Sequence, residues 1–130
     1  MKRRKVLLVD DSTTALLMEH MILKNRGDFD LINARDGVEA VDKATAEMPD
    51  LIVMDIVMPR MGGIEAMKQI RLNEATRHIP IILVTTRGEP ETIETGYASG
   101  CNEYVTKPIN GIELLTKIED LIAAKEEAVR

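Results

Sequence analysis

Five polar side chains each stand at the end of a short apolar or β-branched segment: Asp10, Asp11, Asp55, Thr85 and Lys107. Three carboxylates brought close together repel one another, and a divalent cation between them relieves that repulsion. Mg²⁺ suits this donor set, because it prefers oxygen ligands and commonly uses one or two carboxylates together with a phosphate oxygen. A lysine supplies a point charge for a second phosphate oxygen, and a threonine hydroxyl supplies a directed hydrogen bond. Together these residue types predict a site for phosphoryl transfer.

Asp55 is the predicted nucleophile of this site. A carboxylate can attack phosphorus and hold a covalent intermediate while neighbouring groups oppose the negative charge of the transferring group. Asp55 follows the most apolar segment, Leu51–Met54, whereas Asp10 and Asp11 are adjacent in sequence and better placed to share a metal ion. Taken alone, the Asp10-Asp11 pair could equally be the acidic first turn of a helix. The prediction of a metal site therefore depends on the whole set.

The segments that lead to these residues belong to a regular alternation of strands and helices. Short β-branched runs alternate with longer runs of helical period, which is typical of βαβ units around a parallel sheet. A closed barrel of eight units would need ~200 residues or more. We therefore predict an open, doubly wound α/β fold with five parallel strands and helices on both faces. The predicted strands are Lys5–Val9, Asp30–Ala34, Leu51–Met54, Ile81–Val84 and Glu103–Thr106.

Each predicted helix carries apolar residues at spacings of three and four. Ser12 or Thr13 is expected to cap the first helix, and Gly100 is expected to end the fourth, which runs from about Pro90 to Ala98. The stripes are Leu17, Met18, Met21 and Ile22; Val38, Val41, Thr45 and Met48; Ile64, Met67 and Ile70; Ile93 and Tyr97; and Leu114, Leu115, Ile118, Leu121 and Ile122. The methionines at 18, 21, 48, 54 and 67 are interpreted as core residues rather than a binding face.

The predicted fold places the candidate residues together. In an open parallel sheet, ligands bind outside the carboxyl ends of the strands, in the crevice where the strand order reverses. Asp10 and Asp11 end the first strand, Asp55 the third, Thr85 the fourth and Lys107 the fifth. We expect all five side chains at one edge of the sheet.

The composition favours one soluble domain, residues 1–130 with a core of about 5–124 and no output domain. Apolar residues make up 45% of the chain and charged residues 30%, which is the balance of a globular protein. No apolar run approaches the ~20 residues that cross a bilayer, and the single Cys101 fits a cytoplasmic location. A net charge of −5, with two tyrosines, one phenylalanine and no tryptophan, disfavours binding to nucleic acid.

Four segments resemble the receiver domain of two-component response regulators in their order and spacing. The similarity covers nearly the whole chain. Each segment alone is a weak motif, but the four segments in this order at the strand ends are highly specific. The segments are Val6–Asp11, Leu51–Pro59, Ile82–Thr85 and Tyr104–Pro108. The resemblance is to the chemotaxis-regulator-like, single-domain members, and it implies a flavodoxin-like sheet with strand order 2-1-3-4-5.

The resemblance also implies roles for particular residues. Asp55 would accept a phosphoryl group from a phosphohistidine. Mg²⁺, with Mn²⁺ as a substitute, would be held by the side chains of Asp11 and Asp55 and the main-chain carbonyl of Val57, with Asp10 acting largely through a bound water. Thr85 and Lys107 would engage the phosphoryl group, and the Lys107-Pro108 peptide would be cis. Tyr104 would change its exposure as Thr85 moves; by its residue type alone, it is a half-buried strand aromatic.

The family further implies partners rather than substrates. The expected donor is a sensor histidine kinase or a histidine phosphotransfer protein, and the expected target binds the face formed by the fourth helix, fifth strand and fifth helix. The protein would catalyse only its own phosphorylation and slow autodephosphorylation. It would be a cytoplasmic monomer, with a homodimer as the alternative when it is phosphorylated. The sequence does not separate a chemotaxis-type regulator from a phosphorelay intermediate.

Two positions depart from the family pattern. Gly62 stands where an aspartate is frequent, so the third helix should lack a side-chain cap. Thr86 stands where alanine or glycine is usual beside the phosphoryl group, which bears on water access and phosphate lifetime. Arg87 and Glu89 follow in a loop that is expected to be solvated.

Two other functions fit the sequence less well. Phosphohydrolases with an aspartyl nucleophile carry Asp-x-Asp after the first strand, where this chain has Asp10-Asp11-Ser12. A flavodoxin-like flavin carrier needs a hydroxyl-rich phosphate loop, which Ser12-Thr13-Thr14 faintly suggests, but the two aspartates would repel the phosphate.

Overall fold

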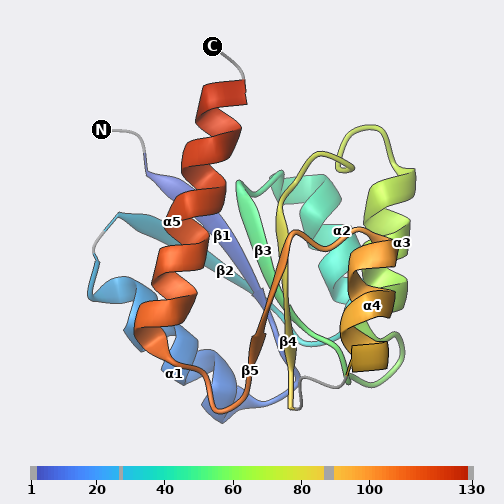
Figure 1. Ribbon diagram of the computed structural model, residues 1–130, viewed down its shortest axis with the longest axis horizontal. Helices are drawn as coiled ribbons and strands as arrows, with labels where there is room; N and C mark the ends of the chain where they lie inside the picture. Colours follow the sequence, from blue (N-terminus) through green and yellow to red (C-terminus); the bar gives the residue numbers. More distant parts are fainter. Residues whose placement is uncertain (1–2, 27, 87–89, 129–130) are drawn as a thin grey trace.

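Strands and helices alternate along the chain in the computed structural model, which describes residues 3–26, 28–86 and 90–128 (Figure 1). The predicted loop residues Arg87 and Glu89 lie outside these ranges. Every predicted strand is present, with ends that differ by at most one residue. The strands are β1 (Arg4–Val9), β2 (Phe29–Ala34), β3 (Leu51–Asp55), β4 (Ile81–Thr85) and β5 (Glu103–Thr106); the helices are α1 (Thr13–Lys24), α2 (Gly37–Glu47), α3 (Gly63–Leu72), α4 (Pro90–Ser99) and α5 (Gly111–Ala128).

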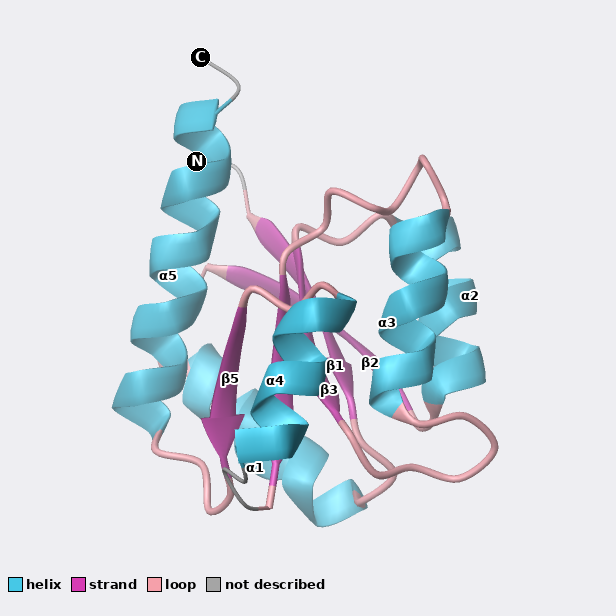
Figure 2. Ribbon diagram, turned by 45° about the vertical axis from the view of Figure 1, so that its right-hand side comes forward, coloured by secondary structure: helices cyan, strands magenta, loops and turns pink. Residues whose placement is uncertain are grey.

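The five strands form one parallel sheet in the order β2-β1-β3-β4-β5. Helices α1 and α5 cover one face, and α2, α3 and α4 cover the other (Figures 1 and 2). The strand order reverses at β1, which pairs with both β2 and β3. A crevice is expected outside the carboxyl ends of these strands. The predicted fold class and strand order are confirmed.

Two apolar cores fill the space between the sheet and its helices. Successive residues of β1 point to opposite faces, so Val6 and Leu8 join the core beneath α1 and α5, while Leu7 and Val9 join the core beneath α2 and α3. Every residue of β3 and β4 is buried, as expected for strands covered on both faces. Full burial of one leucine or isoleucine side chain contributes about 1.5–3 kcal/mol. This packing fixes the strand ends that carry the candidate site.

The predicted inner face of α1 was mostly wrong: of its four residues, only Ile22 packs against the core. Leu17, Met18 and Met21 are 61%, 51% and 66% exposed, and the inner positions are Leu16, Glu19 and Leu23. The error has a physical cause, because apolar residues surround most of this helix and two different stripes satisfied the helical spacing. The stripe that is buried contains the acid Glu19. The predicted cap is correct, because the Ser12 hydroxyl accepts a hydrogen bond from the main-chain N–H of Ala15.

The face predicted for α2 was partly wrong. Ala40 and Ala44 are its buried residues together with Gly37, Val41 packs against the core, and Thr45 is exposed. Met48 lies past the last turn, 43% exposed, with a left-handed φ of 47°. Of the five methionines predicted to be core residues, Met54 and Met67 are buried, and Met18, Met21 and Met48 are not.

The remaining helices follow the sequence more closely. Helix α3 begins after Gly62 without a side-chain cap, as predicted, and buries Met67 and Ile70. Helix α4 ends at Ser99, one residue later than predicted, and Gly100 follows with a φ of 113°. Helix α5 buries four of its five predicted apolar positions. Among the described residues, no helix combines the length and the apolar character needed to cross a membrane.

Candidate functional site

Lys107 joins the carboxyl ends of two other strands at one edge of the sheet. Its ammonium nitrogen Nζ donates to Asp10 Oδ2 at 3.1 Å and to Asp55 Oδ2 at 3.3 Å. Both carboxyls are buried, with exposed fractions of 1% for Asp10 and 6% for Asp55. The gathering of these side chains arises because β1, β3 and β5 run parallel and end at the same level.

Three acidic side chains at this edge could hold a cation. Oxygen atoms of Asp10, Asp11 and Asp55 all lie within 4.8 Å of one another. Asp11 is exposed, while the other two are buried. Asp10 Oδ1 also accepts the main-chain N–H of Ser12 at 2.9 Å, which fixes the orientation of that carboxyl. A compact set of carboxylate oxygens with one open side fits Mg²⁺, a hard ion that retains several waters.

The pKa of Asp55 is raised in the folded protein. Burial raises the pKa of Asp55, and the charge of Asp10 raises it further, while Lys107 and the main-chain N–H of Val57 oppose the rise. For Lys107, burial opposes the charged form, but the hydrogen bond to Asp10 and the charges of Asp55 and Asp10 outweigh it, so the pKa is raised. Lys107 therefore remains a cation.

Thr85 and Val57 lie beside Asp55. Thr85 ends β4 with 8% of its surface exposed, and its main-chain carbonyl accepts the N–H of Lys107 at 2.8 Å. The main-chain N–H of Val57 hydrogen-bonds to the Asp55 carboxyl, while the Val57 side chain is 75% exposed. The peptide between Lys107 and Pro108 is cis. The residues predicted to hold the phosphoryl group and the metal ion therefore lie at one edge.

Tyr104 lies away from the acidic cluster but is linked to Thr85 by a small cavity. The Tyr104 ring packs edge-on against Tyr97, with centroids 6.2 Å apart. Lys117 Nζ lies 5.3 Å from the centroid of the Tyr104 ring and donates to the Tyr104 carbonyl at 2.7 Å. The cavity has a volume of ≈ 10 Å³, and Thr85 and Tyr104 both line it. It is too small to admit a side chain unless its walls move.

An ion pair that the sequence did not predict anchors the loop after Asp55. Arg60 Nε donates to Asp36 Oδ2 at 2.8 Å, and Arg60 adopts a left-handed φ of 64°. The main-chain N–H of Glu39 chiefly, and Arg60 as well, lower the pKa of Asp36. The loop then returns so closely that a Cβ on Gly63 would lie 2.1 Å from the Asp55 carbonyl oxygen. Only glycine fits at this position. In the sequence, the presence of a glycine at position 63 was the available indication of this close approach.

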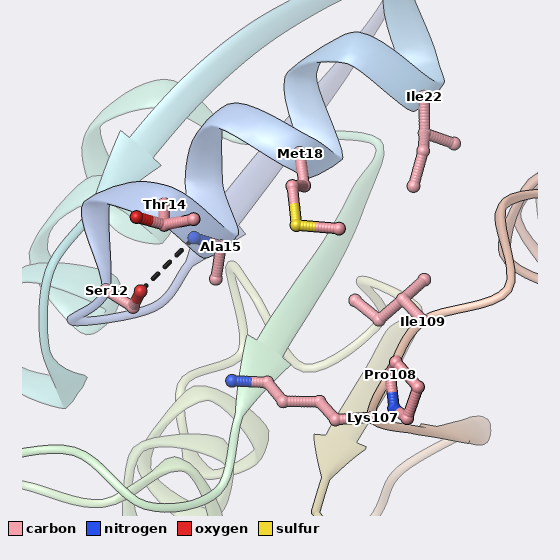
Figure 3. Close-up of a pocket in the computed structure, with 8 residues that line it drawn as sticks. All are labelled: Ser12, Thr14, Ala15, Met18, Ile22, Lys107, Pro108 and Ile109. Carbon is pink, nitrogen blue, oxygen red and sulfur yellow. Dashed lines mark hydrogen bonds between the residues drawn. The ribbon is translucent and has the colours of Figure 1, made fainter.

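An apolar groove opens beside Lys107, between α1 and the loop that precedes α5 (Figure 3). Its volume is ≈ 230 Å³. The lining residues are Ser12, Thr14, Ala15, Met18, Ile22, Lys107, Pro108 and Ile109. Leu17 and Met21 of α1 are also exposed, but they line a separate pocket with His20 and Asn33.

The chain thus combines a doubly wound parallel sheet with an acidic cluster and a lysine at the carboxyl edge of that sheet. A family model for the response regulator receiver domain matches residues 6–119. The chain therefore belongs to the response regulator receiver family of two-component systems. Members of this family are signalling modules that interact with histidine kinases and downstream targets, rather than enzymes of the usual kind.

Curated relatives of different lengths share this similarity. PilH of Pseudomonas aeruginosa is 34% identical over 92% of this chain and 98% of its own length. DivK of Brucella ovis is 36% identical over 82% of this chain and 86% of its own length. The transcriptional regulator PhoP of Bacillus subtilis is 34% identical over 96% of this chain, which spans only about half (51%) of that relative.

Solved structures of receiver domains share this fold. The chemotaxis regulator CheY4 of Vibrio cholerae has a TM-score of 0.86 at 33% identity, covering 92% of this chain and 99% of that chain. The receiver domain of a sensor histidine kinase from Pseudomonas aeruginosa has a TM-score of 0.86 at 29% identity, covering 93% and 98%. The latter structure contains a magnesium ion coordinated in its active-site cleft.

Proposed function

We propose that this protein is a stand-alone response regulator that accepts a phosphoryl group on Asp55 in a Mg²⁺-dependent reaction. The observation that carries the proposal is the position of Lys107 Nζ between Asp10 and Asp55, within a cluster of three carboxylates suited to a divalent ion. The donor is a phosphohistidine on a sensor histidine kinase or a histidine phosphotransfer protein.

The chemical step is an in-line displacement. A carboxylate oxygen of Asp55 attacks phosphorus, the P–N bond to the donor histidine breaks, and the leaving imidazole keeps the bonding electron pair and takes up a proton. Lys107 opposes the charge of the phosphoryl oxygens, and Thr85 provides a hydroxyl donor. Asp10, Asp11 and Asp55, with the Val57 carbonyl, would hold Mg²⁺, or Mn²⁺ in its place. When bound, the metal ion neutralises phosphoryl charge.

The protein catalyses only its own phosphorylation and a slow autodephosphorylation, in which water attacks phosphorus, inorganic phosphate leaves and the Asp55 carboxylate is restored. The signal is a shift between two conformations. The cavity between Thr85 and Tyr104 supports this coupling, because movement of Thr85 toward the phosphoryl group would open space for the Tyr104 ring. A target protein then reads the face formed by α4, β5 and α5.

The apolar groove beside Lys107 supports an approach of the donor from α1. Met18 is half-exposed and lines the groove together with Lys107 and Pro108. A donor protein must bring its phosphohistidine to Asp55, and apolar surface adjoining that residue gives a place for contact. We assign this surface to the donor, and the α4-β5-α5 face to the target.

We further propose that the protein is a cytoplasmic monomer that is able to form a homodimer when it is phosphorylated. Whether the protein regulates a target directly or relays the phosphoryl group is tested by recovery of partners with and without beryllofluoride, which mimics the phosphorylated state.

The test is phosphorylation by a small donor. Incubation with acetyl phosphate or phosphoramidate and Mg²⁺ should add the mass of one phosphoryl group to the intact protein. The Asp55→Asn variant should gain none. An unchanged wild-type mass, or an equal gain in the variant, would remove the proposal.

A further inference from the structure

Glu19 is an acid in the apolar inner face of α1. Its exposed fraction is 1%, and within the described part of the chain neither carboxyl oxygen has a hydrogen-bond partner. The inner residues that flank it on this helix, Leu16 and Leu23, are apolar. An unsatisfied buried polar group costs about 1–3 kcal/mol, a cost that leucine at this position would avoid. Packing alone therefore gives no reason for an acid here.

The charged groups that act on Glu19 all belong to the proposed phosphoryl site. Burial chiefly raises the pKa of Glu19, to about 8, with further contributions from Asp10 and Asp55, while Lys107 opposes the rise. The core beneath α1 contains Leu8 and Val53. Asp10 and Asp55 follow these two residues by two positions and point to the same face. Glu19 thus lies on the interior side of the site, as a carboxyl that is mostly protonated at neutral pH.

The Lys107 ammonium has an N–H donor left for a further acceptor. Its ammonium carries three N–H donors, and the acceptors found in this structure are one oxygen each of Asp10 and Asp55. The lysine side chain has a flexible stem of four carbons. A small movement toward the interior would bring the ammonium toward Glu19 and away from the side on which Asp55 receives a phosphoryl group.

We propose that Glu19 is a positioning residue that acts through Lys107: its carboxyl is an interior acceptor that competes with the phosphoryl group on Asp55 for the Lys107 ammonium. This inference rests on the proposed function of Asp55. The affinity for a phosphoryl mimic falls in proportion to the fraction of molecules in which Lys107 faces outward. Removal of the interior acceptor raises that fraction, and equal inward and outward populations would give about a twofold gain in affinity.

The test compares Glu19→Leu and Glu19→Gln in the full chain with saturating Mg²⁺. Beryllofluoride affinity is measured by titration, and the Lys107 Nζ environment is followed by NMR. Leu23→Ala is the matched control, since Leu23 is buried on the same helix and lies outside the site. Thermal unfolding reports the stability of each variant.

Glu19→Leu should bind beryllofluoride about twofold more tightly and shift the Lys107 signal. Glu19→Gln retains an oxygen acceptor and should stay close to wild type. Leu23→Ala should lose stability without either change. Wild-type affinity and an unmoved Lys107 signal in Glu19→Leu would overturn the role of Glu19, and so would an equal gain in affinity in Leu23→Ala. A wild-type protein that fails to bind beryllofluoride with Mg²⁺ would instead remove the proposed function itself.

Discussion

The Lys107 ammonium lies 3.3 Å from Asp55 Oδ2, although 52 positions separate the two residues in the chain. The contact brings the end of β5 to the end of β3 across the intervening strand β4. It supplies a positive charge at the carboxylate that the proposed reaction converts to an acyl phosphate. Most of the expected chemistry depends on this pair.

Replacement of Lys107 by methionine should slow phosphorylation by acetyl phosphate about 10- to 100-fold, because a hydrogen bond to a charged group contributes about 1.5–3 kcal/mol. Rates are followed by intact mass at saturating Mg²⁺. The control is Lys68→Met, at an exposed position of α3. An unchanged rate in Lys107→Met would show that the ammonium does not assist the transfer.

Removal of Mg²⁺ with a chelator should abolish phosphorylation by acetyl phosphate, and Mn²⁺ should restore it. Asp11→Asn should weaken Mg²⁺ binding in calorimetric titrations, because the variant loses one of three carboxylates that neutralise the cation. Asp42→Asn changes an exposed acid of α2 and should bind Mg²⁺ as wild type does. Metal-independent phosphorylation would contradict the assignment of the acidic cluster.

The buried acid Glu19 should make stability depend on pH. The pKa of Glu19 is raised from 4.5 to about 8 in the folded protein, so the unfolded chain releases this proton at lower pH than the folded one. Stability should therefore fall as pH rises from about 4.5 to 8, by about 1.4 kcal/mol per pH unit from this group.

Urea unfolding of wild type and Glu19→Gln, in the presence of a chelator, measures that contribution. The wild type should lose stability relative to the variant across this range, and the difference should level off above about pH 8. Parallel stability curves for the two proteins would show that Glu19 keeps an ordinary pKa.

The apolar surface of α1 should matter for a protein donor and not for a small one. Met18→Glu places a charge in the groove beside Lys107 and should reduce transfer from a phosphorylated histidine phosphotransfer protein about tenfold or more, as expected for loss of a central apolar contact. Phosphorylation by acetyl phosphate should continue at nearly the wild-type rate. Leu72→Glu, at an apolar position that is 84% exposed on α3, is the matched control. Equal losses with both donors would contradict a docking role.

The strand ends were predictable because parallel strands obey a simple geometric rule. Asp10, Asp55, Thr85 and Lys107 each follow a short apolar run, and the carboxyl edge of the sheet collects whatever residues stand there. The inner face of α1 was not predictable in the same way. With apolar residues on nearly every side of that helix, periodicity could not distinguish the stripe that contains Glu19 from the stripe that contains Met18 and Met21.

The link between Asp36 and Arg60 shows a second limit. Both residues are ordinary surface types in the sequence, and their contact depends on the path of two separate loops and on a left-handed backbone at Arg60. Such a contact follows from the tertiary fold and leaves no local pattern. The close approach of Gly63 to Asp55 likewise depends on the tertiary path of the loop, and the glycine itself is its one local trace.

Site mapping of the phosphoryl group tests the central claim most directly. Borohydride reduces an aspartyl phosphate to homoserine, and peptide mass spectrometry then locates the changed residue after treatment with acetyl phosphate and Mg²⁺. We expect homoserine at position 55 alone, and none in Asp55→Asn or without the metal ion. Conversion at Asp10 or Asp11, or no conversion anywhere in a folded protein, would contradict the account.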